Sequence, residues 1–349
     1  MVSPSPCCAG ALASLILLGL CLCAVAPGLS QADPSDPDLV TALGDRILAC
    51  RTDAGLLLMV PPAEGRPAGY LPYFADVAAY GLFRAHEVTA SAAYPAAADA
   101  CIDWYRAHQQ LDGAVTDDTF APGGTLSSTG DVDSTDSYAA MYLWVLAERH
   151  QVAPDSPQWL RERELTCFRA VSAILLTLQD DGLTTARPSY PIEYTMDNAE
   201  VVVGLRSAGA VFEALGNAGM ASHVRRLADR AEKEVRTLYR PEHGYFAWHR
   251  DLQGQKGYAL EKRYPDVMAQ EPDRSVFAKV GQLHLAPAFE PEKPWEHVWY
   301  GLAAQRVGGE QWMSRLVLPL NSLTRTEIAT FDSLRCSAVL EAITGGTRP

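Results

Sequence analysis

Four acidic side chains form two pairs in which the partners stand three positions apart. One pair is Asp133 and Asp136, and the other is Asp197 and Glu200. Each pair begins a long apolar run, and a spacing of three places both carboxyls on one face if that run is helical. Two carboxyls in a poorly solvated site push their pKa values apart, so that one stays protonated near neutral pH and the other ionised. Such pairs can supply a general acid and a general base.

The same spacing is also typical of helix N-terminal capping, which stabilises a helix by about 1 kcal/mol. Capping alone does not account for Asp131 beside Asp133, or for Asp76 three positions after Tyr73. The arrangement also recurs along the chain. We therefore expect five carboxylates to face a common cleft: Asp76, Asp133, Asp136, Asp197 and Glu200.

The elements that position these residues are expected to be helices. The run from Tyr138 to Ala147 contains no Gly or Pro and is too long for an ordinary strand. It is apolar on every face, which predicts a helix enclosed by protein. The pattern predicts further helices, some apolar on all faces and some on one: 38–51, 70–85, 94–108, 159–179, 195–215, 223–239, one from 294, and 332–344.

Amphipathic and all-apolar helices alternate, and long polar loops lead into the apolar ones. This order favours an outer ring of half-exposed helices around an enclosed inner ring. The loops at 112–130, 180–194 and 240–262 show no β-alternation of useful length, and no fixed repeat divides the sequence. We expect a single all-α domain over 33–349.

Residues 1–32 have the pattern of a signal peptide. The apolar stretch from Ala11 to Val25 is short for a membrane span, and Ser30-Gln-Ala32 fits a signal-peptidase site. We expect cleavage near Ala32 and a periplasmic or secreted mature protein. Because the leader has no Lys or Arg, an uncleaved anchor stays the alternative.

The chain of 349 residues carries a net charge of −13 and no basic run. Nucleic acids and anionic membranes select clustered Lys and Arg, so neither is an expected partner after signal cleavage. The mature chain keeps four cysteines among apolar residues, which can pair or stay as buried thiols: Cys50, Cys101, Cys167 and Cys336. Their spacing fits no zinc motif, and no metal or cofactor is expected.

Five segments resemble the six-hairpin glycosidase superfamily, the (α/α)6 barrels. They are Tyr70-Leu-Pro-Tyr-Phe-Ala-Asp76, Asp133-Ser-Thr-Asp-Ser-Tyr-Ala139, Asp181-Gly-Leu183, Tyr194-Thr-Met-Asp-Asn-Ala-Glu200 and Arg263-Tyr-Pro-Asp266. The resemblance implies an (α/α)6 barrel with its substrate cleft at the end where the inner helices begin. The Asp131-x-Asp133 element is also similar to the cellulase-type family 8 glycosidases. Tyr73 and Asp76 stand where that family has a Glu general acid, which is a departure from its pattern.

The resemblance implies hydrolysis of glycosidic bonds in a polysaccharide or oligosaccharide. This reaction needs one protonated and one ionised carboxyl across the scissile bond. Glu200 is the preferred acid, because a position inside an apolar helix would raise its pKa. Asp133 or Asp136 is the preferred base, and Asp197 is a further catalytic candidate.

Sugar sites need flat apolar surfaces and hydrogen-bonding groups. The candidates for substrate binding lie near helix starts or in loops: Tyr73, Asp76, Asp131, Tyr138, Tyr194, Asn198, Trp248, Tyr264, Asp266 and Trp295. Any of the aromatic ones could instead pack in the core. The expected partner is a carbohydrate, and any link to export or polysaccharide-synthesis machinery stays open.

Two other functions stay open. A polysaccharide lyase or sugar epimerase on the same barrel would use Tyr or His as base and a basic side chain to neutralise a uronate, so Arg187, Arg206 and Arg263 become the residues of interest. A carbohydrate-binding or scaffold protein without catalysis would use the carboxylates only as caps.

Overall fold

The computed structural model describes residues 36–63, 65–121, 125–152, 157–240, 245–246, 249–251 and 323–344. All of them belong to the second of the two units, Met1–Asp33 and Pro34–Pro349, into which the chain divides. The expected leader, the expected helix from 294 and the segment around Asp266 lie outside the described residues. The single-domain boundary at 33 stays a prediction.

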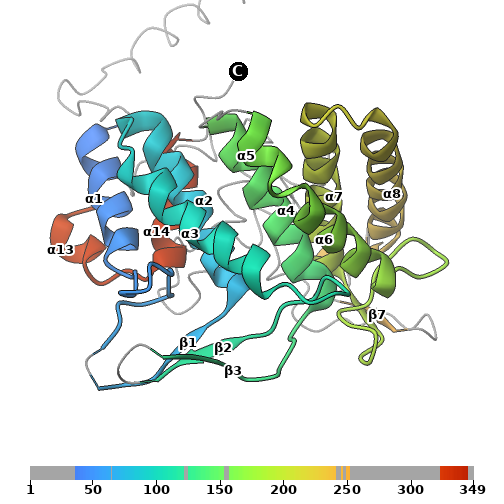
Figure 1. Ribbon diagram of the computed structural model, residues 1–349, viewed down its shortest axis with the longest axis horizontal. Coiled ribbons are helices and arrows are strands. Elements are labelled where there is room, and N and C mark those ends of the chain that lie inside the picture. Colours follow the sequence, from blue (N-terminus) through green and yellow to red (C-terminus); the bar gives the residue numbers. More distant parts are fainter. Residues whose placement is uncertain are drawn as a thin grey trace, which may run out of the picture. The chain divides into compact units, whose positions relative to one another are not determined.

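Helices dominate the described residues (Figure 1). They are α1 Pro37–Leu48, α2 Pro72–Thr89, α3 Ala93–His108, α4 Thr135–Val152, α5 Pro157–Arg161, α6 Glu164–Thr177, α7 Thr195–Ala214, α8 Ala218–Thr237, α13 Arg325–Ile328 and α14 Ser333–Thr344. The all-α prediction is confirmed. Most predicted helix boundaries fall within a few residues of the observed ones.

The helices form an inner and an outer set. Four inner helices pack in the order α14, α2, α4 and α7, although α14 ends the described chain. The outer helices α1, α3, α6 and α8 each pack against one or two of the inner ones. The predicted alternation of layers is therefore present in the described part of the chain.

Composition explains which helix lies in which layer. In α4, every residue from Thr135 to Arg149 is buried, because its apolar side chains point in all directions. In α8, Val224, Ala228 and Val235 belong to one buried stripe, and charged residues cover the other faces. The first is enclosed by neighbours on all sides, and the second covers the outside of α7.

Inner helices approach one another closely where glycine allows it. A Cβ at Gly204 of α7 would lie 2.5 Å from Ala140 Cα in α4. At Gly81 of α2, a Cβ would lie 2.8 Å from Ser337 Cα in α14. Because glycine has no side chain, these two positions allow the inner helices to pack closely against each other.

The strands are short: β1 Ala68–Tyr70, β2 Asp118–Phe120, β3 Leu126–Ser128, β4 Ile192–Tyr194, β5 Tyr239–Arg240, β6 Tyr245–Phe246 and β7 His249–Asp251. Strands β1, β2 and β3 form an antiparallel sheet beside one end of α2 and α3 (Figure 1). Strand β4 pairs with β7, and β5 with β6. The loops expected to lack strands therefore contain them, since two or three residues are too few for alternation to appear in the sequence.

The helix expected over 159–179 is divided into α5 and α6. The chain breaks at Arg163, whose φ of −107° and ψ of 0° depart from helical geometry. Its buried guanidinium donates to Asp103 Oδ1 at 2.6 Å and lies over the Trp159 ring. These contacts are long-range or depend on side-chain direction, so periodicity does not reveal them.

Within the described helices, none combines the length and apolarity needed to cross a membrane.

Candidate active site

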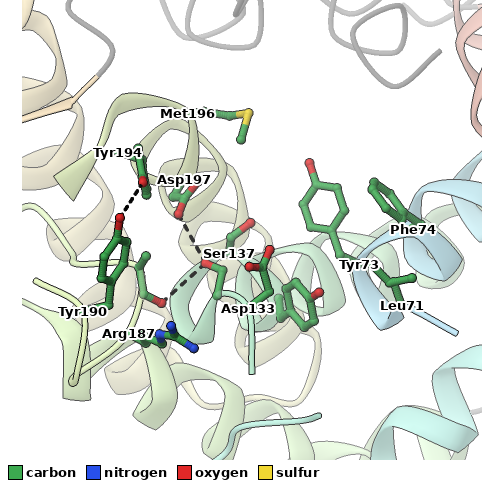
Figure 2. A pocket seen from close by; sticks show the side chains of 13 residues that line it. Leu71, Tyr73, Phe74, Asp133, Ser137, Arg187, Tyr190, Tyr194, Met196 and Asp197 are labelled. Atoms are coloured by element: carbon green, nitrogen blue, oxygen red, sulfur yellow. Dashed lines mark hydrogen bonds between the residues drawn. The ribbon is translucent and has the colours of Figure 1, made fainter. Parts of the chain in front are cut away.

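A cavity of about 740 Å³ lies where three inner helices begin (Figure 2). Helices α2, α4 and α7 contribute their first turns, and the loop between α6 and β4 completes the described wall. The lining residues are Leu71, Tyr73, Phe74, Asp133, Ser134, Ser137, Tyr138, Ala186, Arg187, Tyr190, Tyr194, Met196 and Asp197. This is the end of the barrel at which the sequence predicted a cleft.

The start of α2 fixes two aromatic side chains in this wall. Pro72 occupies the first helical position, where its ring suits the helix and no hydrogen bond is lost. Strand β1 ends two residues earlier and pairs with β2, which anchors the chain before the turn. Tyr73 and Phe74 follow directly and pack edge to face.

Among the described residues, Asp133 and Asp197 are the two carboxylates that line the cavity. Asp133 is exposed and lies just before α4, whereas Asp197 belongs to the first turn of α7 and is 5% exposed. Figure 2 shows both side chains within the same hollow. Of the predicted catalytic residues, these two are brought together at the cavity.

Asp136 is fully buried, is not among the lining residues, and accepts a hydrogen bond from the loop that precedes β4. Its carboxylate accepts hydrogen bonds from Ser134 Oγ at 2.7 Å, Ser137 N at 2.8 Å and Thr184 Oγ1 at 2.6 Å. Burial raises the pKa of Asp136, and the hydrogen bonds from Thr184 and Ser134 partly offset that rise. One donor is a backbone N–H in the first turn of α4, and the other two are side-chain hydroxyls.

Ser134 lies between two carboxylates. Its Oγ is 2.7 Å from Asp136 Oδ1 and 3.2 Å from Asp197 Oδ2. A hydroxyl has one proton to donate, so Ser134 Oγ can donate to only one of the two carboxylates at a time. Ser134 therefore links Asp136 to Asp197 at the cavity.

Glu200 lies directly behind the cavity wall and is almost fully buried. Tyr73 Oη donates to Glu200 Oε1 at 2.6 Å, and Ser137 Oγ donates to Oε2. Both donors line the cavity, but Glu200 is not among its lining residues. The carboxylate thus joins α2, α4 and α7 where their first turns meet.

Tyrosines form two opposite groups in the lining. The rings of Tyr73 and Tyr138 lie 6.0 Å apart, and Tyr138 Oη donates to Asp117 Oδ1 at 2.9 Å. Tyr190 and Tyr194 join their hydroxyls at 3.2 Å on the other side. Burial raises the pKa of Asp117, and nearby Asp133 adds to that rise. Three predicted binding residues, Tyr73, Tyr138 and Tyr194, are thus among those that line the cavity.

Three predicted binding residues lie away from the cavity lining. Asp76 is buried inside the barrel wall, its Oδ2 has no hydrogen-bond partner in the described residues, and burial raises its pKa strongly. Asn198 is fully buried and binds both backbone groups of Thr184 at 2.7 and 2.9 Å. Asp131 is exposed and is not among the lining residues. Trp248, Tyr264, Asp266 and Trp295 lie outside the described residues.

Several lining residues have no counterpart among the predicted sites. Ser134, Ser137, Phe74, Met196 and Tyr190 come from the same helix starts and the same loop. The useful signal was position: each lies within a few residues of a predicted carboxylate or tyrosine at the entry to an apolar helix. Residue type alone does not indicate these residues, because serine and methionine occur throughout the chain.

The cysteines are not among the described residues that line the cavity. Cys50, Cys101, Cys167 and Cys336 are buried free thiols. Within the described part of the chain, no three His, Cys, Asp or Glu side chains gather as metal ligands would.

No protein-family model matches the sequence, and no curated protein does. Solved structures match over most of the chain. An uncharacterized conserved protein from Thermus thermophilus has a TM-score of 0.61 at 12% identity, covering 87% of this chain and 99% of its own. A GH63 mannosylglycerate hydrolase from the same organism has a TM-score of 0.60 at 13% identity, with the same coverage. A D-mannose isomerase has a TM-score of 0.57 at 12% identity and covers 91% of this chain and 100% of its own.

The chain therefore has an (α/α)6-barrel fold, as the sequence predicted. At these identities the likeness establishes the fold. Proteins with this fold include both hydrolases and an isomerase, so the reaction has to be argued from the site.

Proposed function

We propose that the protein is a glycoside hydrolase that cleaves a polysaccharide or oligosaccharide by carboxylate acid–base chemistry. The observation that carries the proposal is that Asp133 and Asp197 line one cavity together with four tyrosines. Hydrolysis of a glycosidic bond requires two carboxyl groups with different protonation states. The two aspartates have the different surroundings that such a division requires.

Asp197 is proposed as the general acid. It is nearly buried at the cavity wall, and burial favours the uncharged form of a carboxyl. It can then donate its proton to the leaving oxygen of the scissile bond. This role replaces Glu200, the acid favoured by the sequence, whose oxygens are engaged by Tyr73 and Ser137.

Asp133 is proposed as the ionised partner. It lines the cavity from the exposed turn just before α4. An ionised carboxylate there can activate a water molecule or attack the sugar directly, depending on its distance from the acid. The expected signal peptide would deliver the enzyme to the periplasm or the exterior, where polysaccharides are accessible.

A polysaccharide lyase is the second candidate. Arg187 lines the same cavity as the tyrosines, and a lyase uses such a pairing to neutralise a uronate and remove a proton. Elimination leaves a carbon–carbon double bond in one product, whereas hydrolysis adds water and leaves two saturated ends.

Product analysis on a panel of bacterial polysaccharides and their oligosaccharides tests the proposal. Mass spectrometry should show two fragments whose summed mass exceeds that of the substrate by one water molecule. Fragments without added water, one of them unsaturated, would favour the lyase. Conversion without cleavage would indicate an isomerase, and binding without any conversion would overturn the enzymatic proposal.

A further inference from the structure

Arg187 is the one basic side chain among the described residues that line the cavity. It belongs to the loop between α6 and β4, where Tyr190 N donates to Arg187 O at 2.9 Å. In Figure 2 its guanidinium lies on the same side of the cavity as Tyr190. The loop that leads into α7 thus places a positive charge in a site that otherwise holds carboxylates.

The guanidinium is held in place by neutral groups. Nη1 donates to the carbonyl oxygen of Val132 at 2.8 Å, directly before Asp133 in the chain. The carbon at the centre of the guanidinium lies 5.6 Å from the centroid of the Tyr190 ring. Both contacts restrict the orientation of the side chain without neutralising its charge.

Arg187 forms no ion pair within the described part of the chain, and its buried Nε has no hydrogen-bond partner there. Other enclosed arginines differ. Arg84 lies 2.9 Å from Glu148, Arg149 lies 2.7 Å from Asp99, and Arg163 lies 2.6 Å from Asp103. A positioned guanidinium with donors unused by the described residues is available to an anionic partner.

The chemistry of the group indicates what that partner is. The planar guanidinium presents parallel N–H donors that match the two oxygens of a carboxylate. An acidic sugar would otherwise be repelled by Asp133 and by the net charge of −13 on the chain. A fixed arginine beside Asp133 removes that barrier at the one place where the acidic group would lie.

We propose that Arg187 determines specificity by binding the carboxylate of an acidic sugar, so that the substrate is a uronate-containing glycan. This assignment rests on the proposed glycoside hydrolysis. Arg187 selects the substrate and orients it against Asp133 and Asp197, and takes no part in proton transfer.

The test compares uronate oligosaccharides with the same oligosaccharides after reduction of their carboxyl groups to alcohols. The wild-type enzyme should hydrolyse the uronate form with the higher kcat/KM. In Arg187→Met, kcat/KM for the uronate form should fall about 100-fold, the loss expected for two charge-assisted hydrogen bonds. For the reduced form it should change less than about 3-fold. Arg187→Lys should retain part of the preference, because it keeps the charge and loses the planar fork.

Arg161→Met is the matched control, since Arg161 is exposed at the end of α5, and it should behave as wild type. Equal wild-type activity on both forms would overturn the role of Arg187 and leave hydrolysis intact. A sulfated oligosaccharide preferred over its uronate counterpart would overturn the carboxylate assignment.

Calorimetric binding to Asp197→Asn separates this inference from the proposed function. If no glycan is hydrolysed by wild type but the uronate form binds only when Arg187 is present, the hydrolase proposal fails and the role of Arg187 stands. If the uronate form binds equally to Asp197→Asn and to its Arg187→Met double variant, the role of Arg187 is wrong.

Discussion

Ser134 and Ser137 determine how the neighbouring carboxylates are used. Ser134 Oγ lies closer to the Asp136 carboxylate than to that of Asp197, whereas Ser137 Oγ donates to Glu200. The sequence correctly indicated that acidic side chains gather at inner-helix starts. It did not indicate which of them face the cavity, because Ser137 and Glu200 are 63 positions apart and meet only in the folded barrel.

Glu200→Gln tests whether that residue holds the wall or performs chemistry. We expect activity to fall less than about 10-fold, since the amide can still hydrogen-bond to both hydroxyls. Glu200→Leu should lower the free energy of unfolding by about 1–3 kcal/mol, because Tyr73 and Ser137 lose their buried acceptor. Steady-state kinetics and urea unfolding provide the two measurements. A folded Glu200→Gln variant with activity reduced more than about 100-fold would restore Glu200 as the acid.

At the scale of elements, a glycine lets the backbones of the inner helices α4 and α7 approach closely. Their apolar composition was enough to predict that they are enclosed. Their mutual distance was not predictable, because it depends on Gly204 lying opposite Ala140. The short strands and the break between α5 and α6 were missed for the same reason, since long-range contacts fix them.

Gly204→Ala is expected to lower the free energy of unfolding by about 1–3 kcal/mol, although alanine is the better helix former. The added Cβ would lie 2.5 Å from Ala140 Cα, and a backbone atom cannot move aside as a side chain can. Gly219→Ala is the control, because its Cβ would meet nothing closer than 3.8 Å in α8. Denaturant unfolding that shows equal effects for both variants would disprove the close approach.

At the scale of the whole molecule, a buried charge cluster joins the helices at the end opposite the cavity. Arg84 of α2 contacts Glu148 of α4 at 2.9 Å and Glu87 at 2.7 Å, and Glu341 of α14 lies 3.9 Å away. Tyr80 Oη donates to Glu341. Within the described residues, three carboxylates share one guanidinium, and the cluster joins α2 to α4 and α14.

Stability is expected to fall as the pH rises from about 5 to 8. Burial, with additional repulsion from Glu341 and Glu87, raises the pKa of Glu148 to about 7, while Arg84 opposes the rise. The folded protein therefore holds a proton that the unfolded chain releases above its ordinary pKa of 4.5. The contribution is complete below that ordinary pKa and is lost as the pH passes 7. Its size is at most about 3 kcal/mol.

Unfolding free energies at pH 5 and pH 8 provide the measurement. Glu148→Gln should flatten the pH dependence, because the amide keeps a hydrogen-bonding group beside Arg84 and has no proton to lose. Glu162→Gln, at an exposed position, should retain the wild-type slope. A wild-type protein that becomes more stable toward pH 8 would contradict this account of the cluster.

The central claim is that Asp197 protonates the leaving group while Asp133 acts as the ionised partner. The most direct measurement is kcat for a natural oligosaccharide and for an aryl glycoside of the same sugar, whose leaving group needs no proton. Asp197→Asn should lose about 10²–10⁴-fold on the oligosaccharide and much less on the aryl glycoside. Asp133→Asn should lose activity on both, whereas Asp53→Asn, in an exposed turn, should lose neither. Equal losses on the two substrates for Asp197→Asn, or unchanged activity in Asp133→Asn, would contradict the account.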